Sequence, residues 1–317
     1  MTRVMVTGGA GFVGRELVRT LKERSEVVVA DLLRYGTPDW LADPDGFTFQ
    51  RVDIRDAAAT REVVEQVSPD VIVHLAAIHY IPECDKDPAN AVATNVTGTV
   101  NVLAACPAGT RFVFASSGAV YKPDDAPHRE FESTVEPVDI YGITKNHGED
   151  YVRMFAVNRD LACVIVRLFN VIGPGETNPH LLPAIVAQLR DNPEAISLGN
   201  TWPQRDYIDV QDSAGGFAAA ALGADPKPGG CDVVNLGSGS QYSVDDIVDR
   251  MRSLLGLQFE VRQDTSRMRA VDRPYLGADI TRIREVFGWS PQFDLNQTLQ
   301  RMWDKPDFLP ALEGRLT

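Results

Sequence analysis

The stretch VMVTGGAGFVG, residues 4–14, decides the fold. It begins with a mainly apolar run of strand length, and an amphipathic segment of helical length continues from it to residue 24. Glycines at 8, 11 and 14 would allow a sharp turn, a close approach to a pyrophosphate and packing of the helix on the strand. The N–H groups at a helix N-terminus favour a bound phosphate. The stretch therefore predicts a strand–turn–helix unit that binds a dinucleotide, although GxxGxxG alone also suits a plain tight turn.

Apolar segments of strand length alternate with amphipathic segments of helical length through the first 170 residues. Apolar strands separated by helices are typical of a parallel sheet that is covered on both faces. Right-handed crossovers then give a doubly wound sheet, with its ligands at the carboxyl ends of the strands. The expected strands are 4–7, 27–30, 47–52, 71–76, 111–115 and 163–169, and the expected helices are 12–24, 57–66, 89–105 and 140–158.

The pattern changes after Gly173-Pro174-Gly175, where Pro and Gly become frequent and the segments become shorter. Here we expect a helix at 182–190, a strand at 233–236 and a helix at 244–255. The chain is thus predicted to be an α/β protein. A Rossmann-type, doubly wound parallel sheet is expected over residues 1–172, and a smaller α/β C-terminal substrate lobe over residues 173–317, with some segments interleaved.

The 317-residue chain carries a formal net charge of −13. That charge argues against nucleic-acid and anionic-membrane partners, because both need clustered Lys and Arg. No apolar run approaches the ~20 residues that span a bilayer, and no signal peptide is expected before the first strand. The four cysteines and five histidines show no metal-ligand spacing, so no metal is expected. Scattered cysteines are typical of a reducing compartment, so we expect a cytoplasmic protein.

Asp31 ends the second expected strand, about 20 residues beyond the glycine loop. An acid at this place can accept hydrogen bonds from both hydroxyls of the adenosine ribose, and its charge repels a 2′-phosphate. Asp31 therefore predicts NAD as the cofactor in preference to NADP. Arg34, three residues further on, could soften that preference.

Tyr141 and Lys145 lie four residues apart in an expected helix, so their side chains share one face. A phenol titrates near pH ~10, and a neighbouring cation lowers its pKa by favouring the phenolate. Such a tyrosine can act as general base or acid toward a substrate hydroxyl. Upstream, an apolar strand ends in Ser116 and Ser117, where a second hydroxyl could hold the substrate oxygen. In isolation these patterns also fit a solvated helix face and a turn.

Six motifs follow one another in the first half of the chain. They are TGGAGFVG (7–14), VDIRD (52–56), HLAA (74–77), NVTGT (95–99), SSGAVY (116–121) and YGITK (141–145). In this order they resemble the extended short-chain dehydrogenase/reductases, and specifically the nucleotide-sugar epimerase/dehydratase group of the UDP-galactose 4-epimerase type. The resemblance continues through RLFNVIGP (167–174), RDYIDV (205–210), NLGSG (235–239) and FGW (287–289), and so covers nearly the whole chain.

The resemblance implies a set of residues around the cofactor NAD. The implied pyrophosphate contacts are Gly8, Gly11, Phe12, Val13 and Gly14, the ribose contact is Asp31, and the adenine contacts are Asp53 and Ile54. The implied residues on the nicotinamide side are Leu75, Ala76, Ala77 and Phe169, and Asn95 is implied to lie near the cofactor. Ser117, Tyr141 and Lys145 form the implied catalytic triad, of which Tyr141 and Lys145 also contact NAD.

The resemblance also implies contacts to a nucleotide-diphosphate sugar. These are Ser117 and Asn170, with Arg205 and Arg269 on the diphosphate, where guanidinium groups match phosphate geometry. Arg267 or Arg273 could take the place of Arg269. His79 follows the HLAA motif and could reach the sugar, either as a substrate-specific acid or base or as a polar residue over the site.

A tightly held NAD and a tyrosine base suit removal of hydride from C4 of a sugar, and its return to the opposite face gives C4 epimerisation. Family 4,6-dehydratases carry Asp-Glu directly after the catalytic Ser/Thr, whereas Gly118 and Ala119 follow Ser117 here. The predicted activity is therefore an NAD-dependent nucleotide-sugar epimerase. The alternatives are a 4-ketoreductase, a dehydratase or decarboxylase with other acids, and a non-catalytic dinucleotide-sensing regulator. The intact triad counts against the regulator.

Family members commonly dimerise through two helices. These helices correspond here to the segments 89–105 and 140–158. The resemblance therefore implies a homodimer.

Overall fold

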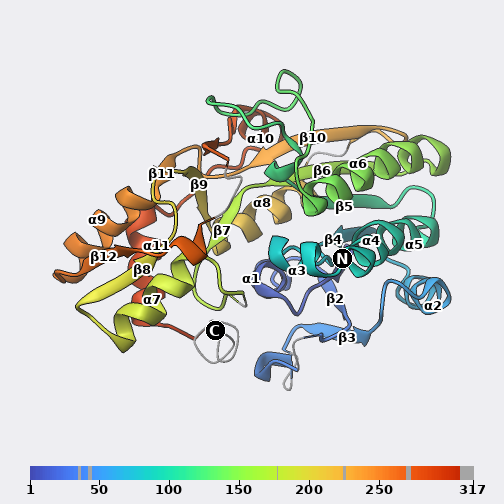
Figure 1. Cartoon of the computed structure of the whole chain (residues 1–317). Helices are drawn as coiled ribbons and strands as arrows, with labels where there is room; N and C mark the ends of the chain where they lie inside the picture. The colour runs from blue at the N-terminus through green and yellow to red at the C-terminus, as the bar shows by residue number, and fades with distance from the viewer. Residues whose placement is uncertain (35–36, 42–44, 177, 224–225, 269–272, 308–317) are drawn as a thin grey trace.

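The computed structural model describes residues 1–34, 37–41, 45–176, 178–223, 226–268 and 273–307 (Figure 1). At its centre lies a sheet of seven parallel strands in the order β10-β6-β5-β4-β1-β2-β3. The strands are β1 (Arg3–Thr7), β2 (Glu26–Asp31), β3 (Phe47–Arg51), β4 (Val71–His74), β5 (Arg111–Ser117), β6 (Ala162–Leu168) and β10 (Cys231–Leu236). This arrangement confirms the predicted Rossmann-type α/β fold.

The middle of the sheet is built from buried valines. Val4 of β1 pairs with Val27 of β2 on one side and with Val71 of β4 on the other. The chain runs outward from β1 through β2 to β3, and then returns to the other side of β1 with β4. The strand order therefore reverses between β1 and β4, and in open parallel sheets ligands bind beside the carboxyl ends of the strands at such a point.

Helices cover both faces of the sheet. One face packs against α1 (Phe12–Leu21), α8 (Val210–Leu222) and α10 (Thr281–Phe287), and the other against α2 (Ala57–Val67), α5 (Gly98–Ala105) and α6 (Ile140–Arg159). Burial on both faces explains why the strands read as continuous apolar runs and not as alternating ones. The expected helix 89–105 is divided into α4 (Pro88–Val92), a π-helical turn (Ala93–Thr97) and α5, which lies beside α6 (Figure 1).

The C-terminal lobe has its own small core. Its strands are β7 (Asn170–Ile172), β9 (Gln204–Asp209), β11 (Gln241–Ser243) and β13 (Tyr275–Leu276) in one sheet, and β8 (Ala195–Leu198) with β12 (Glu260–Gln263) in another. Its helices are α7 (Leu181–Asp191), α9 (Val244–Leu255) and α11 (Leu295–Asp304), and α3 (Ile81–Lys86) lies outside this lobe, next to α4. The predicted helices 182–190 and 244–255 are α7 and α9. The short strands were not predicted, because few of their residues follow a simple apolar pattern.

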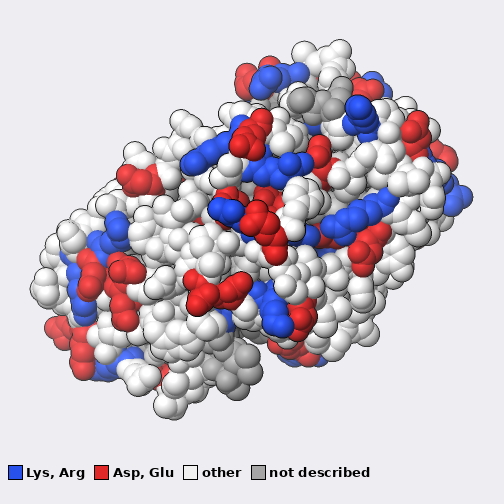
Figure 2. Space-filling view, turned by 90° about the horizontal axis from the view of Figure 1, so that it is seen from above, with Lys and Arg blue, Asp and Glu red and all other residues white. Residues whose placement is uncertain are grey.

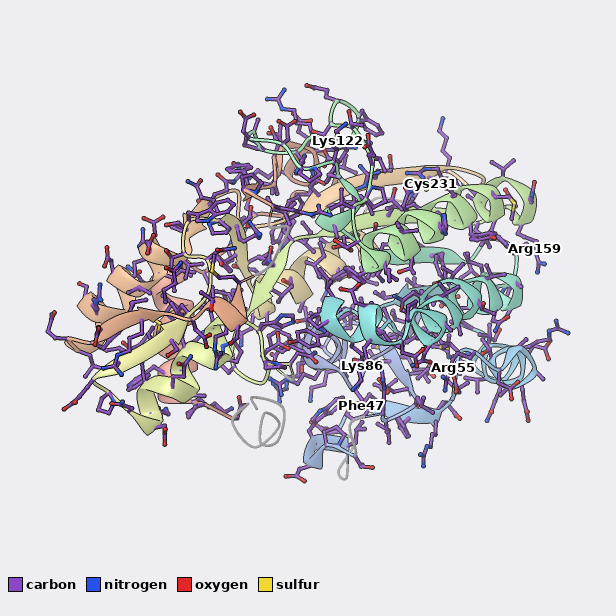
Figure 3. All side chains as sticks on the ribbon, in the orientation of Figure 1. Phe47, Arg55, Lys86, Lys122, Arg159 and Cys231 are labelled. Carbon is purple, nitrogen blue, oxygen red and sulfur yellow. The ribbon has the colours of Figure 1, made fainter. Side chains whose placement is uncertain are left out.

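The two parts of the chain are interleaved. Strand β10, from the second half, is the edge strand of the central sheet, where Val234 pairs with Val166 of β6. In Figure 3, Cys231 marks the beginning of this strand, and the figure places it close to α6. The four cysteines are all free thiols.

The surface carries mixed charge. On the face shown in Figure 2, basic and acidic side chains lie next to one another with uncharged residues between them. Among the helices in the described ranges, none is long and apolar enough to cross a membrane.

Candidate active site

A large cavity lies beside the carboxyl ends of the central strands and reaches into the C-terminal lobe. Its volume is about 1110 Å³. Most of the sequence-predicted site residues line it. They are Gly8, Gly11, Phe12, Val13, Gly14, Asp31, Asp53, Ile54, Leu75, Ala76, Ala77, His79, Ser117, Tyr141, Lys145, Phe169, Asn170 and Arg205. The fold thus brings these residues from eight separate segments of the sequence to one place.

The glycine loop between β1 and α1 is shaped by close backbone contacts. Gly8 has a φ of 71°, and a Cβ on it would lie 2.7 Å from the backbone nitrogen of Ala76. A Cβ on Gly14 would lie 2.3 Å from the carbonyl oxygen of Gly8, so only glycine lets α1 pack this closely on the loop. Helix α1 begins at Phe12, and its N-cap residue Gly11 makes no side-chain cap hydrogen bond. The loop therefore presents a helix N-terminus to the cavity, which fits the pyrophosphate of NAD.

Asp31 ends β2 at the edge of this loop. Its carboxylate accepts hydrogen bonds from the backbone N–H groups of Ala10 (3.1 Å) and Leu33 (2.7 Å), and burial raises its pKa. These contacts fix the carboxylate between the glycine loop and the end of the strand. The neighbouring Arg34 also lines the cavity, but its guanidinium forms an ion pair with Glu83 of α3. The positive charge that could attract a 2′-phosphate is therefore already balanced by an acid.

Asp53 and Ile54 form the wall beyond β3. Arg55 donates to both carboxylate oxygens of Asp53, which lowers the Asp53 pKa, and it also donates to the Asn90 side chain of α4 (2.8 Å). Arg55 is labelled in Figure 3 below the helices α4 and α5. The pair therefore orients Asp53 and ties this wall to α4.

The predicted triad is assembled at the end of β5 and the start of α6. Ser117 and Tyr141 both line the cavity, and the Ser117 hydroxyl accepts from the backbone N–H of Ala119 (3.1 Å). The ammonium of Lys145 donates to the carbonyl of Ala115 (2.7 Å) and lies 5.8 Å from the centre of the Tyr141 ring. Asp139 caps α6 by accepting from the N–H of Gly142, which fixes where the helix begins. Ser117 and Tyr141 can therefore bind the same substrate oxygen.

The electrostatics of the triad differ from the sequence-based expectation in one respect. Lys145 was expected to lower the pKa of Tyr141, but burial raises it, and the nearby Ser117 side chain offsets this only in part. Burial also lowers the pKa of Lys145 to about 8. The physical reason is that an enclosed cavity disfavours both the phenolate and the ammonium. Without a further positive charge, the tyrosine is a proton donor and not a base.

Asn95 lies behind the cavity wall. Its amide oxygen accepts from the backbone N–H of Ile78 (2.8 Å), and its amide nitrogen donates to the Ile78 carbonyl (2.9 Å) and to the hydroxyl of Thr144 (3.0 Å). These three bonds hold the turn before His79 against α6. In this structure Asn95 is a positioning residue for the wall, whereas the sequence suggested a place at the cofactor itself.

The arginines of the C-terminal lobe have different surroundings. Arg205 lines the cavity, and its guanidinium donates to the carbonyl of Arg273 (2.8 Å). Arg267 also lines the cavity, on the turn Thr265–Arg267, and Arg273 instead donates to the carbonyls of Ala119 and Tyr121. Arg269 lies outside the described residues. Among the described arginines of this lobe, Arg205 and Arg267 are therefore the ones that line the cavity.

Two residues of the wall were missed by the sequence analysis. Glu176 and His180 line the same end of the cavity as His79 and Tyr80. They carry no family motif, and about 100 residues separate them from His79, so no spacing along the sequence could reveal them. A further missed group is the buried ion pair of Glu149 and Arg167 (2.7 Å), where Glu149 also accepts from Ser116 (2.6 Å) and so anchors α6 to the end of β5.

The chain is similar to a family of known proteins over most of its length. The model of the family described as NAD-dependent epimerase/dehydratase matches residues 4–237. The UDP-glucose 4-epimerase of Mycolicibacterium smegmatis is 34% identical over 94% of this chain and 96% of its own length. The GDP-6-deoxy-D-mannose reductase of Pseudomonas aeruginosa is 27% identical, over 94% of this chain and 95% of its own.

Solved structures of 4-epimerases are also similar to this chain. The UDP-glucuronic acid 4-epimerase from Bacillus cereus, in complex with UDP-glucuronic acid and NAD, is 25% identical with a TM-score of 0.85. The match covers 98% of this chain and 100% of that one. The family description names NAD, and this confirms the cofactor predicted from the glycine loop and Asp31.

Proposed function

Because the chain belongs to the NAD-dependent epimerase/dehydratase family, we propose that it is a nucleotide-sugar 4-epimerase. The observation that carries the proposal is the grouping of Ser117, Tyr141 and the buried Lys145 at the wall of a cavity large enough for a dinucleotide and a nucleotide sugar. Relatives whose names include 4-epimerase, among them the protein from Mycolicibacterium smegmatis, support the same activity.

Each residue of the triad has a defined part in this reaction. When bound, NAD supplies the hydride acceptor, and its positive ring favours the phenolate form of Tyr141. Tyr141 takes the proton from the hydroxyl on C4 of the sugar while C4 is oxidised to a ketone. It returns the proton when the ketone is reduced on its opposite face. Ser117 holds the reacting oxygen by a hydrogen bond. Lys145 stays charged next to the phenol and is fixed by the carbonyl of Ala115.

Two observations bear on the alternative activities within the family, 4,6-dehydration and 4-ketoreduction. Gly118 and Ala119 follow Ser117 in a short turn, so this turn holds no acid that could drive a 4,6-dehydration. A 4-ketoreductase is the second candidate, because a GDP-6-deoxy-D-mannose reductase is among the relatives. The two activities differ in their redox balance, since a reductase consumes NAD(P)H and an epimerase does not.

The test is the Tyr141→Phe variant, assayed with a panel of UDP-, GDP-, CDP- and dTDP-sugars and chromatography of the products. We expect a new isomer without added reductant, and a fall in kcat of about 10²–10⁴-fold in the variant with little change in KM. Tyr151→Phe on the exposed face of α6 is the matched control and should keep full activity. Full activity of Tyr141→Phe would exclude the tyrosine from the chemistry, and consumption of NAD(P)H would identify a reductase.

We also propose that the enzyme is a homodimer. Helix α6 exposes Ile143, Met154 and Val157. Met154 and Val157 follow Ile143 by 11 and 14 residues, so the three side chains share one helix face. Val157 is 71% exposed. Val92 of the neighbouring α4 is exposed as well. Apolar patches of this kind on soluble proteins commonly mark interfaces. Light scattering of the parent protein should give a particle of twice the mass of the chain. Val157→Glu should lower the measured mass toward that of one chain. A monomeric parent protein would contradict the proposal.

The four free cysteines support a reducing compartment, and we propose a cytoplasmic location on that ground.

A further inference from the structure

Three side chains that the proposed reaction does not use meet at one end of the cavity. His79 follows β4, Glu176 follows β7, and His180 is the N-terminal cap of α7. The potential ligand atoms of the three side chains all lie within 4.8 Å of one another. The cluster therefore joins the central sheet to the C-terminal lobe.

The surroundings of the cluster hold its rings in place. Nε2 of His79 is hydrogen-bonded to the side-chain amide of the buried Asn178 (3.2 Å). The ring of Tyr80 packs edge-on against His180, with 5.3 Å between the ring centres. Glu176 is only 3% exposed, and its carboxylate accepts from the backbone N–H of Asn178 (3.1 Å). These contacts fix the orientation of the two rings and of the Glu176 carboxylate.

Two imidazoles and one carboxylate form a ligand set with known chemistry. Catalytic zinc sites commonly use three protein ligands of these types and leave a fourth position open. Ligands of one tetrahedral Zn²⁺ lie about 3.5 Å apart, because each is about 2.1 Å from the ion. The ligand atoms of the cluster therefore need to approach one another by only about 1 Å to bind one ion.

We propose that His79, Glu176 and His180 bind one divalent transition-metal ion of the Zn²⁺ class, with its open position toward the cavity. All three side chains line the cavity that also holds the triad. An ion at this place can take an oxygen of the ligand that fills the cavity. Metal binding itself does not depend on the reaction that the triad performs, so it can be tested whether or not the enzyme is an epimerase.

The experiment is a calorimetric titration of the metal-free, full-length protein with ZnCl₂. We expect one Zn²⁺ per chain, and a loss of at least about tenfold in affinity in Glu176→Gln and in His180→Ala, since each removes one ligand. His147→Ala is the matched control, because His147 lies exposed on α6, and it should bind Zn²⁺ as the parent protein does. Thermal melts of each variant show whether it is folded.

A second measurement needs no variant. Co²⁺ added to the parent protein should give the visible absorption of a four-coordinate ion, and one equivalent of Zn²⁺ should displace it. The proposal is overturned if the parent protein shows no saturable Zn²⁺ binding. It is equally overturned if folded Glu176→Gln and His180→Ala bind Zn²⁺ as tightly as the parent, or if His147→Ala loses binding to the same extent as they do.

Discussion

Replacing Lys145 by methionine should make the NAD-free protein more stable at neutral pH. The Lys145 side chain is 3% exposed, and burial lowers its pKa from an ordinary value of 10.5 to about 8. A lowered pKa means that the folded protein binds the proton less tightly than the unfolded chain does. The stability of the parent protein should therefore rise as the pH increases from about 8 to 10.5, where the unfolded chain still holds the proton.

The size of the effect follows from these values. The pKa difference corresponds to about 3 kcal/mol of destabilisation at pH 7, because one pKa unit is worth about 1.4 kcal/mol. Methionine removes this penalty, but it leaves the carbonyl of Ala115 without its donor, which costs about 1 kcal/mol. The free energy of unfolding at pH 7 should therefore rise by about 1–2 kcal/mol, which corresponds to roughly 2–5 °C in Tm for a chain of this size.

The assay is thermal unfolding of NAD-free protein between pH 7 and pH 10.5, followed by circular dichroism. Lys86→Met on the exposed side of α3 is the control (Figure 3) and should leave Tm within about 1 °C of the parent. The advantage of Lys145→Met should shrink as the pH approaches 10.5. A variant that is less stable than the parent at pH 7, or an advantage that does not change with pH, would refute the reasoning.

Three further predictions concern the ligands. Asp31→Ala should weaken NAD binding by tens-fold in calorimetry, because a hydrogen bond to a charged group contributes about 1.5–3 kcal/mol; equal NAD and NADP affinities in the parent protein would contradict the assignment. Glu83→Gln should release the guanidinium of Arg34 from its ion pair and so strengthen NADP binding relative to NAD, and an unchanged ratio of the two dissociation constants would exclude this role. Arg205→Ala should raise the KM for the nucleotide sugar and leave the content of bound NAD unchanged, whereas loss of NAD would place the arginine at the cofactor.

The sequence was most informative where one residue type has one physical reason to be present. The glycines at 8 and 14 are required by contacts to Ala76 and Gly8, and Asp31 follows a strand whose apolar run is easily seen. The strands of the central sheet were predictable because burial on both faces makes them continuous apolar runs. The family, the fold and the cofactor predicted from these motifs are confirmed.

Features that depend on distant contacts could not be predicted. The π-helical turn at Ala93–Thr97 interrupts a segment that reads as one helix, and the amide of Asn95, inside that turn, contacts Ile78 rather than lining the cavity. The raised pKa of Tyr141 depends on how fully the cavity encloses it, which the sequence does not show. His79, Glu176 and His180 come together only because the segments that follow β4 and β7 meet the N-terminus of α7.

The position of β10 also determines when this protein can fold during its synthesis. Domains generally fold as units as the chain leaves the ribosome. The edge strand of the nucleotide-binding sheet ends at Leu236, and the buried pairs that it makes with β6 cannot form until that residue has emerged. Until then, β6 keeps an open edge that could pair with another nascent chain. A cut after residue 172 should thus yield an aggregation-prone fragment, whereas one near residue 237, where the family match ends, keeps the sheet whole.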